Sequence, residues 1–266
     1  MLVEGRGRIA VWEGASLWVL QAARETGGTD FHAHHAIQIT LSLEGDFELQ
    51  TETERLTGPA VAVASDARHI FRAHGMVAFL FVAPESPAGR ALAAVTFRET
   101  ALAALPLAPL AEPMAALAAW FRADGSEAEM IALGQHLLDA IAGHAQSPPA
   151  DKRVEAMLAY VEDGIDGALT LPAAASAACL SPSRARHLFA AQTGLPFKTY
   201  VLWRRIEKAV ALYAAGASLT DAAHEAGFAD SAHLSRTFRR TFGLPASALQ
   251  VNERFTASGA ACNIIS

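Results

Sequence analysis

Two strings, FAAQTGLP at 189–196 and FRRTFGLP at 238–245, share the pattern Phe-x4-Gly-Leu-Pro and lie 49 residues apart. Upstream of each string, a short Ala-rich segment leads to a break and then to a new helical segment. That second segment begins at Ser181-Pro182 in the first copy and near Asp230-Ser231 in the second. Serine is a common N-cap, and proline fits the first position of a helix. The repeat therefore predicts two helix-turn-helix units.

The residues that join the two copies support the same interpretation. We expect one long helix over Phe197–Ala215 that ends at Gly216, because glycine commonly terminates helices. Ser218-Leu-Thr-Asp221 resembles the capping box that begins a helix. Each second helix is basic, through Arg184, Arg186, Arg236, Arg239 and Arg240. An Ala-rich bundle with a solvated arginine face is the alternative, but two basic copies favour binding to DNA, where cations displace the counterions of the phosphates.

The region from about 153 to 250 resembles the AraC/XylS family of bacterial transcription regulators. The matching strings include Leu180-Ser181-Pro182-Ser183-Arg184 and Gly227-Phe228-Ala229-Asp230-Ser231. One departure is Cys179, where the family usually has glycine at a sharp helix end. We expect a slightly different turn there, and a cysteine that behaves as a small buried hydrophobe.

The resemblance implies which side chains would contact DNA. In the first reading helix these are Ser183, Arg186 and His187, with Arg184 adding charge. The matching residues of the second are Ser231, Ala232, Ser235 and Arg236. Arg186 and Arg236 could each bind a guanine through two hydrogen bonds. Arg204, Arg239 and Arg240 are expected at phosphates, which set the register of the protein on DNA.

Charge is divided unevenly along the 266 residues. The net charge of −6 alone argues against a nucleic-acid binder. However, residues 1–150 carry 9 Lys and Arg against 17 Asp and Glu, whereas residues 184–254 carry 10 against 5. These opposite signs indicate two domains with different partners.

The remaining composition bounds the class of protein. With 52% hydrophobic residues the chain can form a sizeable core. We expect no transmembrane helix, because no sufficiently long apolar run lacks charge, and no secretory signal at the N-terminus. Cys179 and Cys262 lie far apart and are interpreted as reduced thiols of a cytoplasmic protein.

The first 83 residues are interpreted as β structure. Apolar and polar residues alternate from Phe31 to Leu43, which predicts a strand with one apolar and one polar face. Glu44-Gly45-Asp46 predicts a turn, and a return strand should follow at Phe47–Thr51. Further short strands are expected at Val61–Ala64 and Val77–Val82. The predicted fold is a two-domain α+β protein whose N-terminal part is a small antiparallel, cupin-like β-barrel.

Between the barrel and the helix-turn-helix units, a sequence rich in Ala and Leu predicts helices at about 88–104, 110–123 and 127–144. The predicted domains are a sensing barrel at 1–83, a helical connector at 84–146 and a double helix-turn-helix domain at 151–255. The linker is Gln146-Ser-Pro-Pro-Ala150, since Pro-Pro cannot continue a helix. The apolar residues of the connector would either form a homodimer interface or pack within the chain. They are Leu92, Val95, Leu102, Leu117, Trp120, Leu133, Leu137 and Ile141.

Histidines are concentrated in the first half. His32, His34 and Gln38 share the polar face of the predicted strand, and a His-x-His pair on a strand can present two imidazoles to one metal. Together with His69 they resemble the two cupin motifs, which implies His32, His34, Gln38 and His69 as ligands of a divalent metal. Gln38 stands where the motif usually has glutamate. His35 lies on the apolar face, and His74 is expected in a loop.

Three interpretations of this set stay open. The histidines are polar lining or surface; or they line a metal-free small-molecule pocket; or they hold the metal. The pocket residues would be His32, His34, Gln38, Thr40 and His69.

The leading hypothesis for function is a sequence-specific DNA-binding transcription regulator that responds to a small-molecule effector. Its partners would be double-stranded DNA, a second copy of the chain and RNA polymerase; activation and repression stay open. The alternative is a metal-dependent cupin enzyme fused to a DNA-binding module. We expect no catalysis, because the polar strand face lacks the carboxylate that non-haem iron sites use.

Overall fold

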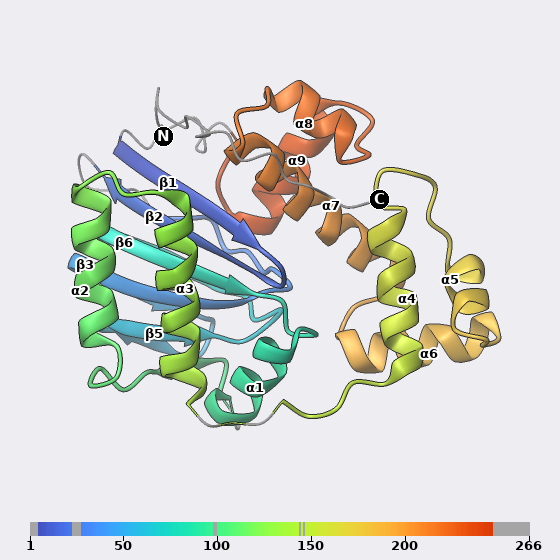
Figure 1. Cartoon of the computed structure of the whole chain (residues 1–266), viewed down its shortest axis with the longest axis horizontal. Coiled ribbons are helices and arrows are strands. Elements are labelled where there is room, and N and C mark those ends of the chain that lie inside the picture. The colour runs from blue at the N-terminus through green and yellow to red at the C-terminus, as the bar shows by residue number, and fades with distance from the viewer. Residues whose placement is uncertain (1–4, 23–27, 98–99, 144, 146, 247–266) are drawn as a thin grey trace.

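An antiparallel sheet of seven strands forms the N-terminal half of the computed structural model (Figure 1), which describes residues 5–22, 28–97, 100–143, 145 and 147–246. The spatial order is β1-β2-β6-β3-β5-β7, and β4 pairs with β3. The strands are β1 Gly5–Trp12, β2 Ala15–Ala22, β3 Ile37–Gln50, β4 Arg55–Thr57, β5 Ala60–Val63, β6 Ile70–Val82 and β7 Leu102–Ala104.

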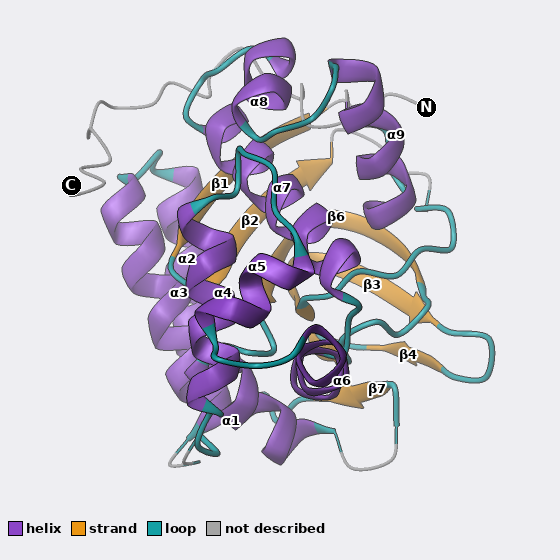
Figure 2. Ribbon diagram, turned by 90° about the vertical axis from the view of Figure 1, so that its right-hand side faces the viewer, coloured by secondary structure: helices purple, strands orange, loops and turns teal. Residues whose placement is uncertain are grey.

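The sheet is open, so the prediction of a closed barrel is wrong. Among the described residues, β1 pairs only with β2 and β7 only with β5, which makes them the two edges. Helices cover one face and the C-terminal domain covers part of the other (Figure 2), so the sheet buries its apolar side chains as a layer without curling onto itself.

The turn predicted at Glu44-Gly45-Asp46 is also wrong, because β3 runs through it. Gly45 pairs with Gly75 of β6, and the register shifts between Ser42 and Glu44 as in a β-bulge. Both glycines have positive φ, 81° and 86°. A Cβ on Gly45 would lie 2.4 Å from the carbonyl oxygen of His74, so glycine here allows close contact inside a bent strand. His74, expected in a loop, therefore lies in β6.

The connector differs from its prediction at one end. Helix α1 (Pro87–Thr96) is shorter than the expected 88–104, and β7 joins the sheet through Val61–Val63. The sheet thus extends past residue 83. Helices α2 (Ala111–Arg122) and α3 (Glu127–Ala142) confirm the other two predicted helices.

Helices α1, α2 and α3 pack on one face of the sheet (Figure 1). Their core includes Leu92, Leu117, Trp120 and Leu137 together with Ile37, Ile39 and Leu41 of β3. Gly134 of α3 lies so close to β1 that an added Cβ would meet Trp12 at 2.5 Å. Intrachain packing thus accounts for the apolar connector residues except Val95, which is 46% exposed.

The C-terminal domain is built from six helices among its described residues. They are α4 Lys152–Asp163, α5 Leu171–Ala177, α6 Pro182–Thr193, α7 Phe197–Ala214, α8 Leu219–Glu225 and α9 Ser231–Phe242. The pairs α5–α6 and α8–α9 confirm the two predicted helix-turn-helix units, and α7 confirms the long connecting helix. None of the described helices has the length and hydropathy needed to cross a bilayer.

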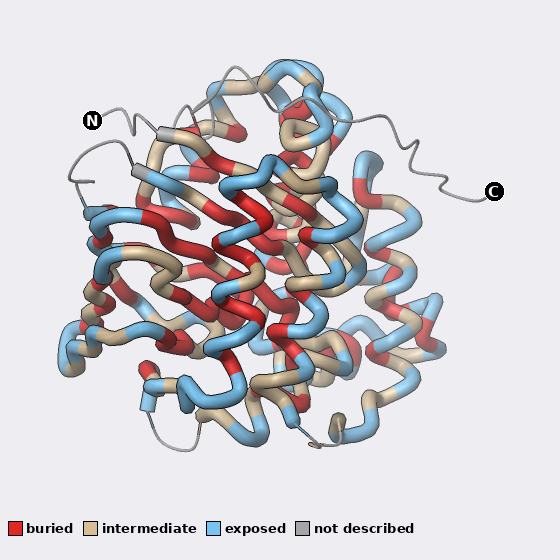
Figure 3. Tube along the Cα trace, turned by 60° about the vertical axis from the view of Figure 1, so that its left-hand side comes forward, coloured by how far each residue is buried: buried red, intermediate tan, exposed pale blue. Residues whose placement is uncertain are grey.

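The second unit and α7 share a hydrophobic core with the other face of the sheet. Trp18 and Phe81 of the sheet pack with Trp203, Ile206 and Phe242. The ring centroids of Trp18 and Phe242 are 5.6 Å apart. Figure 3 shows buried residues along the strands and on the inner sides of the helices, so both faces of the sheet contribute to the core.

Candidate functional site

The first helix-turn-helix unit forms as its sequence signals predict. Ser181 caps α6 by accepting a hydrogen bond from the backbone N–H of Arg184, and Pro182 opens the helix. Gly194 ends the helix in the left-handed conformation, with φ of 78°. The buried residues Ala185 and Phe189 orient α6, so that Ser183, Arg184, Arg186 and His187 are all exposed.

The second unit repeats this construction. Ser218 caps α8 by accepting from the N–H of Asp221, which is the N-cap half of the predicted capping box, and its hydroxyl donates to the Asp221 carboxylate at 2.6 Å. Asp230 caps α9 through the N–H of His233, and Gly243 ends it with φ of 67°. On α9, Ala232, Arg236, Arg239 and Arg240 are exposed, and Ser231 and Ser235 are partly exposed.

Cys179 occupies the same turn position in the first unit as Gly227 in the second. Their φ angles are 53° and 77°, both in the left-handed region. The following N–H closes the turn in each copy, from Leu180 to Ala175 and from Phe228 to Ala223. The expected difference in the turn is therefore wrong, since the cysteine adopts the conformation of the glycine. The expectation of burial is wrong too, because Cys179 is exposed. Cys262 lies outside the described residues.

Two of the arginines expected at phosphates have protein partners in this structure. Arg204 lies between Glu162 and Glu207, at 2.6 and 2.9 Å, with 23% of its side chain exposed. Arg239 pairs with Asp30 of the N-terminal domain at 3.1 Å. Contact of Arg204 or Arg239 with a phosphate would require these pairs to open or to be shared.

The structure brings together the three histidines that the sequence singled out. His32 and His69 face each other across an isolated β-bridge, and their ring centroids are 4.3 Å apart. The ring of His34 lies 5.7 Å from that of His32 and 5.1 Å from that of His69. All three side chains are buried: His32 is 6% exposed, His34 3% and His69 0%. One ring nitrogen from each lies within 4.8 Å of the others.

Burial and mutual repulsion keep these imidazoles neutral. Desolvation, together with the charge of His34, lowers the pKa of His32 to about 4. Desolvation, followed by the charges of His34 and His32, lowers the pKa of His69 to about 2. The pKa of His34 is also lowered, chiefly by burial. Neutral imidazoles have a lone pair available for a ligand.

The predicted strand from Phe31 begins only at Ile37, so His34 precedes β3, whereas Gln38 and Thr40 lie on it. The Gln38 amide lies 2.9 Å from His34 Nε2 and 2.8 Å from Thr40 Oγ1. Both residues are almost fully buried. The amide nitrogen of Gln38 donates to Thr40, and its oxygen faces Nε2 of His34.

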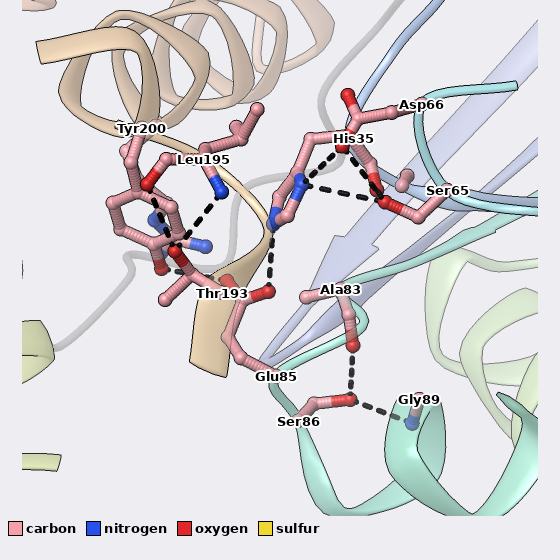
Figure 4. Close-up of polar contacts among 12 residues, drawn as sticks. His35, Ser65, Asp66, Ala83, Glu85, Ser86, Gly89, Thr193, Leu195 and Tyr200 are labelled. Carbon is pink, nitrogen blue, oxygen red and sulfur yellow. Dashed lines mark hydrogen bonds and ion pairs between the residues drawn. The ribbon is translucent and has the colours of Figure 1, made fainter. Parts of the chain in front are cut away.

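A second buried polar group, which the sequence did not reveal as a site, links the two domains (Figure 4). His35 Nε2 lies 3.0 Å from Glu85 Oε2, and the Tyr200 hydroxyl donates to Glu85 Oε1 at 2.6 Å. Asp66 stands 3.6 Å from His35 Nδ1. Burial opposes the charged form of His35, but Asp66 and Glu85 outweigh it and raise its pKa to about 9. Only the tertiary structure places these residues together.

The end of α9 touches the histidine cluster. The backbone N–H of Asp30 donates to the carbonyl of Gly243 at 3.0 Å, and the carbonyl of Asp30 lies 2.9 Å from His32 Nδ1. A Cβ on Gly243 would come within 2.7 Å of His32 Nδ1. His34 also lies 6.0 Å from the ring of Phe242 and 6.3 Å from that of Trp203. The cluster is therefore part of the domain interface.

Comparisons with known proteins agree with this architecture. Residues 174–251 match the model of a helix-turn-helix domain family. The arabinose operon regulatory protein of Salmonella typhimurium is 30% identical over 106 residues, which cover 39% of this chain and 38% of that protein. That of Escherichia coli is 32% identical over 98 residues, which cover 36% and 34%. The matched segments thus span less than two fifths of either relative.

Solved structures match over nearly the whole chain. The crystal structure of ToxT from Vibrio cholerae aligns with a TM-score of 0.60 at 11% identity, covering 91% of this chain and 100% of that one. A second ToxT structure, described as bound to an unsaturated fatty acid, aligns with a TM-score of 0.55 at 12% identity, covering 90% and 96%. At this identity the likeness establishes the fold. The helix-turn-helix family match and the likeness of the second half to the arabinose operon regulatory proteins agree with the two helix-turn-helix units of the C-terminal domain.

Proposed function

We propose that the protein is a sequence-specific DNA-binding transcription regulator. The observation that carries this proposal is the pair of matching capped units whose second helices carry exposed arginines, Arg184 and Arg186 in the first half of α6 and Arg236 in the middle of α9. The N-terminal turn of such a helix meets base edges in the major groove. Arg186 and Arg236 would read bases, and the exposed Arg240 would contact phosphate.

The N-terminal domain would receive the signal. Its buried polar set, His32, His34, Gln38, Thr40 and His69, lies against the end of α9, so a small-molecule effector bound there would act directly on the second unit. Homodimerisation and contact with RNA polymerase would belong to the same function, which would place the protein in the cytoplasm.

Equilibrium binding of the full chain to duplex DNA tests the proposal. A binding sequence is first selected from a randomised duplex library, and its affinity is then measured over a series of salt concentrations. We expect tight binding that weakens as salt rises, because bound cations release counterions from the phosphates. Failure to enrich any sequence, together with no salt-dependent affinity, would rule the proposal out.

An assay for metal-dependent turnover by the same protein distinguishes the proposed regulator from the rival function. A metal-dependent cupin enzyme fused to a DNA-binding module needs open metal positions for substrate. We propose binding without catalysis, because the cluster of three imidazoles found among the described residues lacks the carboxylate of the two-His, one-carboxylate set of non-haem iron enzymes. Turnover that depends on metal and is lost with His32→Ala would favour the rival.

A further inference from the structure

The three clustered histidines share one arrangement of hydrogen bonds. Nδ1 of each ring lies 2.9 Å from a backbone carbonyl two residues away: Asp30 for His32, Ala36 for His34 and Ala67 for His69. A carbonyl oxygen only accepts hydrogen bonds, so each Nδ1 must donate. All three rings are thereby fixed in the tautomer that leaves Nε2 with a free lone pair.

In the part of the chain that the structure describes, two of these lone pairs face no hydrogen-bond donor. His69 is 0% exposed, so water does not reach its Nε2 atom, and this atom has no hydrogen-bond partner in the protein. A buried unpaired acceptor costs free energy, so its persistence points to a missing partner. Nε2 of His34 faces the amide oxygen of Gln38 at 2.9 Å, and an oxygen cannot donate a hydrogen bond to it.

Fixing Nδ1–H on a carbonyl is how proteins orient histidines that bind metal through Nε2. The nitrogen atoms of the cluster lie within 4.8 Å of one another, a space for a single ion. Three imidazoles and no carboxylate suit zinc, cobalt, nickel or copper, whereas magnesium and calcium prefer oxygen ligands. The site has three protein ligands, which leaves a fourth position for water or another group.

We propose that His32, His34 and His69 bind one divalent transition-metal ion through their Nε2 atoms, at the contact between the sheet and α9. This names the chemical class of ligand for the site that the proposed regulator would use to receive its signal. Gln38, which the motif pattern suggested as a ligand, donates through its amide nitrogen to Thr40 and lies outside the proposed ligand set.

An ion at this site would act on DNA binding through Asp30. The backbone of Asp30 bonds both His32 and Gly243, and its carboxylate pairs with Arg239. An ion that fixes the His32 ring would therefore also fix Asp30, which would stabilise its contacts with Gly243 at the end of α9 and with Arg239, an arginine expected at phosphate. We expect the metal to weaken DNA binding; this part rests on the proposed function, whereas the metal site itself does not.

The experiment is a metal titration of the full chain after treatment with a chelator. We expect one Zn²⁺ per chain, measured by competition with a chromophoric chelator, and a visible absorption band with Co²⁺. Zn²⁺ should raise the unfolding temperature, whereas Mg²⁺ should not. His69→Gln should weaken Zn²⁺ binding by more than the roughly 10–100-fold lost with outer-shell partners. His136→Gln, at an exposed histidine of α3, is the matched control and should bind as the wild type does.

Each outcome decides one part of the inference. If the wild type binds no Zn²⁺, Co²⁺ or Ni²⁺, or if His69→Gln binds as tightly while retaining its circular dichroism spectrum, the site is wrong. Should His69→Gln fail to fold, the wild-type titration still decides. DNA affinity that Zn²⁺ leaves unchanged would overturn the regulatory step alone. Loss of DNA binding with and without metal would overturn the proposed function and leave the site standing.

Discussion

At the scale of single residues, Cys179 shows how one substitution in a repeat is accommodated. The cysteine adopts φ of 53° where the second copy has Gly227. A side chain in this region brings Cβ close to the carbonyl oxygen, which costs roughly 1–2 kcal/mol. The turn survives because the hydrogen bond from Leu180 to Ala175 and the buried residues of α5 and α6 hold it.

Replacing this residue should stabilise the domain. Cys179→Gly removes the steric cost but adds freedom to the unfolded chain, so we expect a net gain of about 0.5–1 kcal/mol in the free energy of unfolding. Denaturant unfolding of the two proteins measures it. Gly227→Ala is the reciprocal change and should destabilise, because its Cβ would also meet Arg205 at 3.0 Å. Equal stability of wild type and Cys179→Gly would contradict this explanation.

His35 gives a pH dependence whose sign follows from its pKa. The folded-state pKa is about 9, above the usual 6.5, because Asp66 and Glu85 favour the charged ring against the cost of burial. The charged ring therefore stabilises the fold fully below about pH 6.5, and this contribution declines as pH rises to about 9. We expect the stability difference between wild type and His35→Gln to decline by roughly 2–3 kcal/mol over that interval.

Urea unfolding of both proteins at several pH values measures this difference. Comparison with the variant matters because the lowered pKa values of His32 and His69 have the opposite effect, destabilising the fold as pH falls below about 6.5. A stability difference that stays constant between pH 6.5 and 9 would contradict the charged state of His35.

At the scale of elements, the two reading helices differ in what surrounds them. On α6 the residues proposed to face bases are exposed, whereas α9 ends against Asp30 and His32. The signals for both helices were local: an N-cap, an opening residue and a terminal glycine. This is why the sequence predicted α5 to α9 closely.

Local signals were insufficient in the sheet. Gly45 in a polar context predicts a turn, and only its partner Gly75, thirty residues on, shows that it belongs to a bulged strand. Residues 102–104 read as the end of a helix, yet they form an edge strand because β5 lies beside them. Alternation singled out His32 and His34, but the predicted strand over these two residues is wrong, because β3 begins at Ile37 and His32 forms only an isolated bridge with His69. The burial of the histidine cluster under α7 and α9 depends on a domain contact that no local pattern encodes.

The arginines of the reading helices should separate base contacts from phosphate contacts. Arg186→Ala should relax the preference for one base at a single position of the DNA site, by about 1–3 kcal/mol.

Arg239→Ala should weaken binding to all sequences alike and reduce the slope of log affinity against log salt concentration by about one. Competition binding with single-base variants of the selected site measures both effects. Arg122→Ala, on α2 in the sheet domain, is the control that should change neither. Uniform weakening by Arg186→Ala would contradict its base contact.

At the scale of the whole molecule, the two domains share an apolar core that is accompanied by polar contacts. Trp18, Phe81, Trp203 and Phe242 form the apolar part of the contact. Glu85–Tyr200 and Asp30–Arg239 flank it. A signal in the sheet domain would thus reach the DNA-binding helices through direct contact, as a shift between two domain arrangements.

Removing one link should loosen this contact. Tyr200→Phe deletes a hydrogen bond of 2.6 Å to a largely buried carboxylate, a type of bond worth about 1.5–3 kcal/mol. We expect faster hydrogen exchange in α7 and in the segment around Glu85. Tyr160→Phe, which loses a hydrogen bond inside the C-terminal domain, is the matched control and should leave the exchange around Glu85 unchanged. Unaltered exchange in Tyr200→Phe would show that this link does not hold the domains together.

The central claim is that both units read DNA, and a footprint of the full chain on its selected sequence tests it most directly. Two reading helices on one chain should protect two stretches on the same side of the duplex, about 34 Å or one helical turn apart. Arg186→Ala should weaken protection of one stretch and Arg236→Ala of the other. A single protected stretch, or two stretches that respond identically to both variants, would contradict the account.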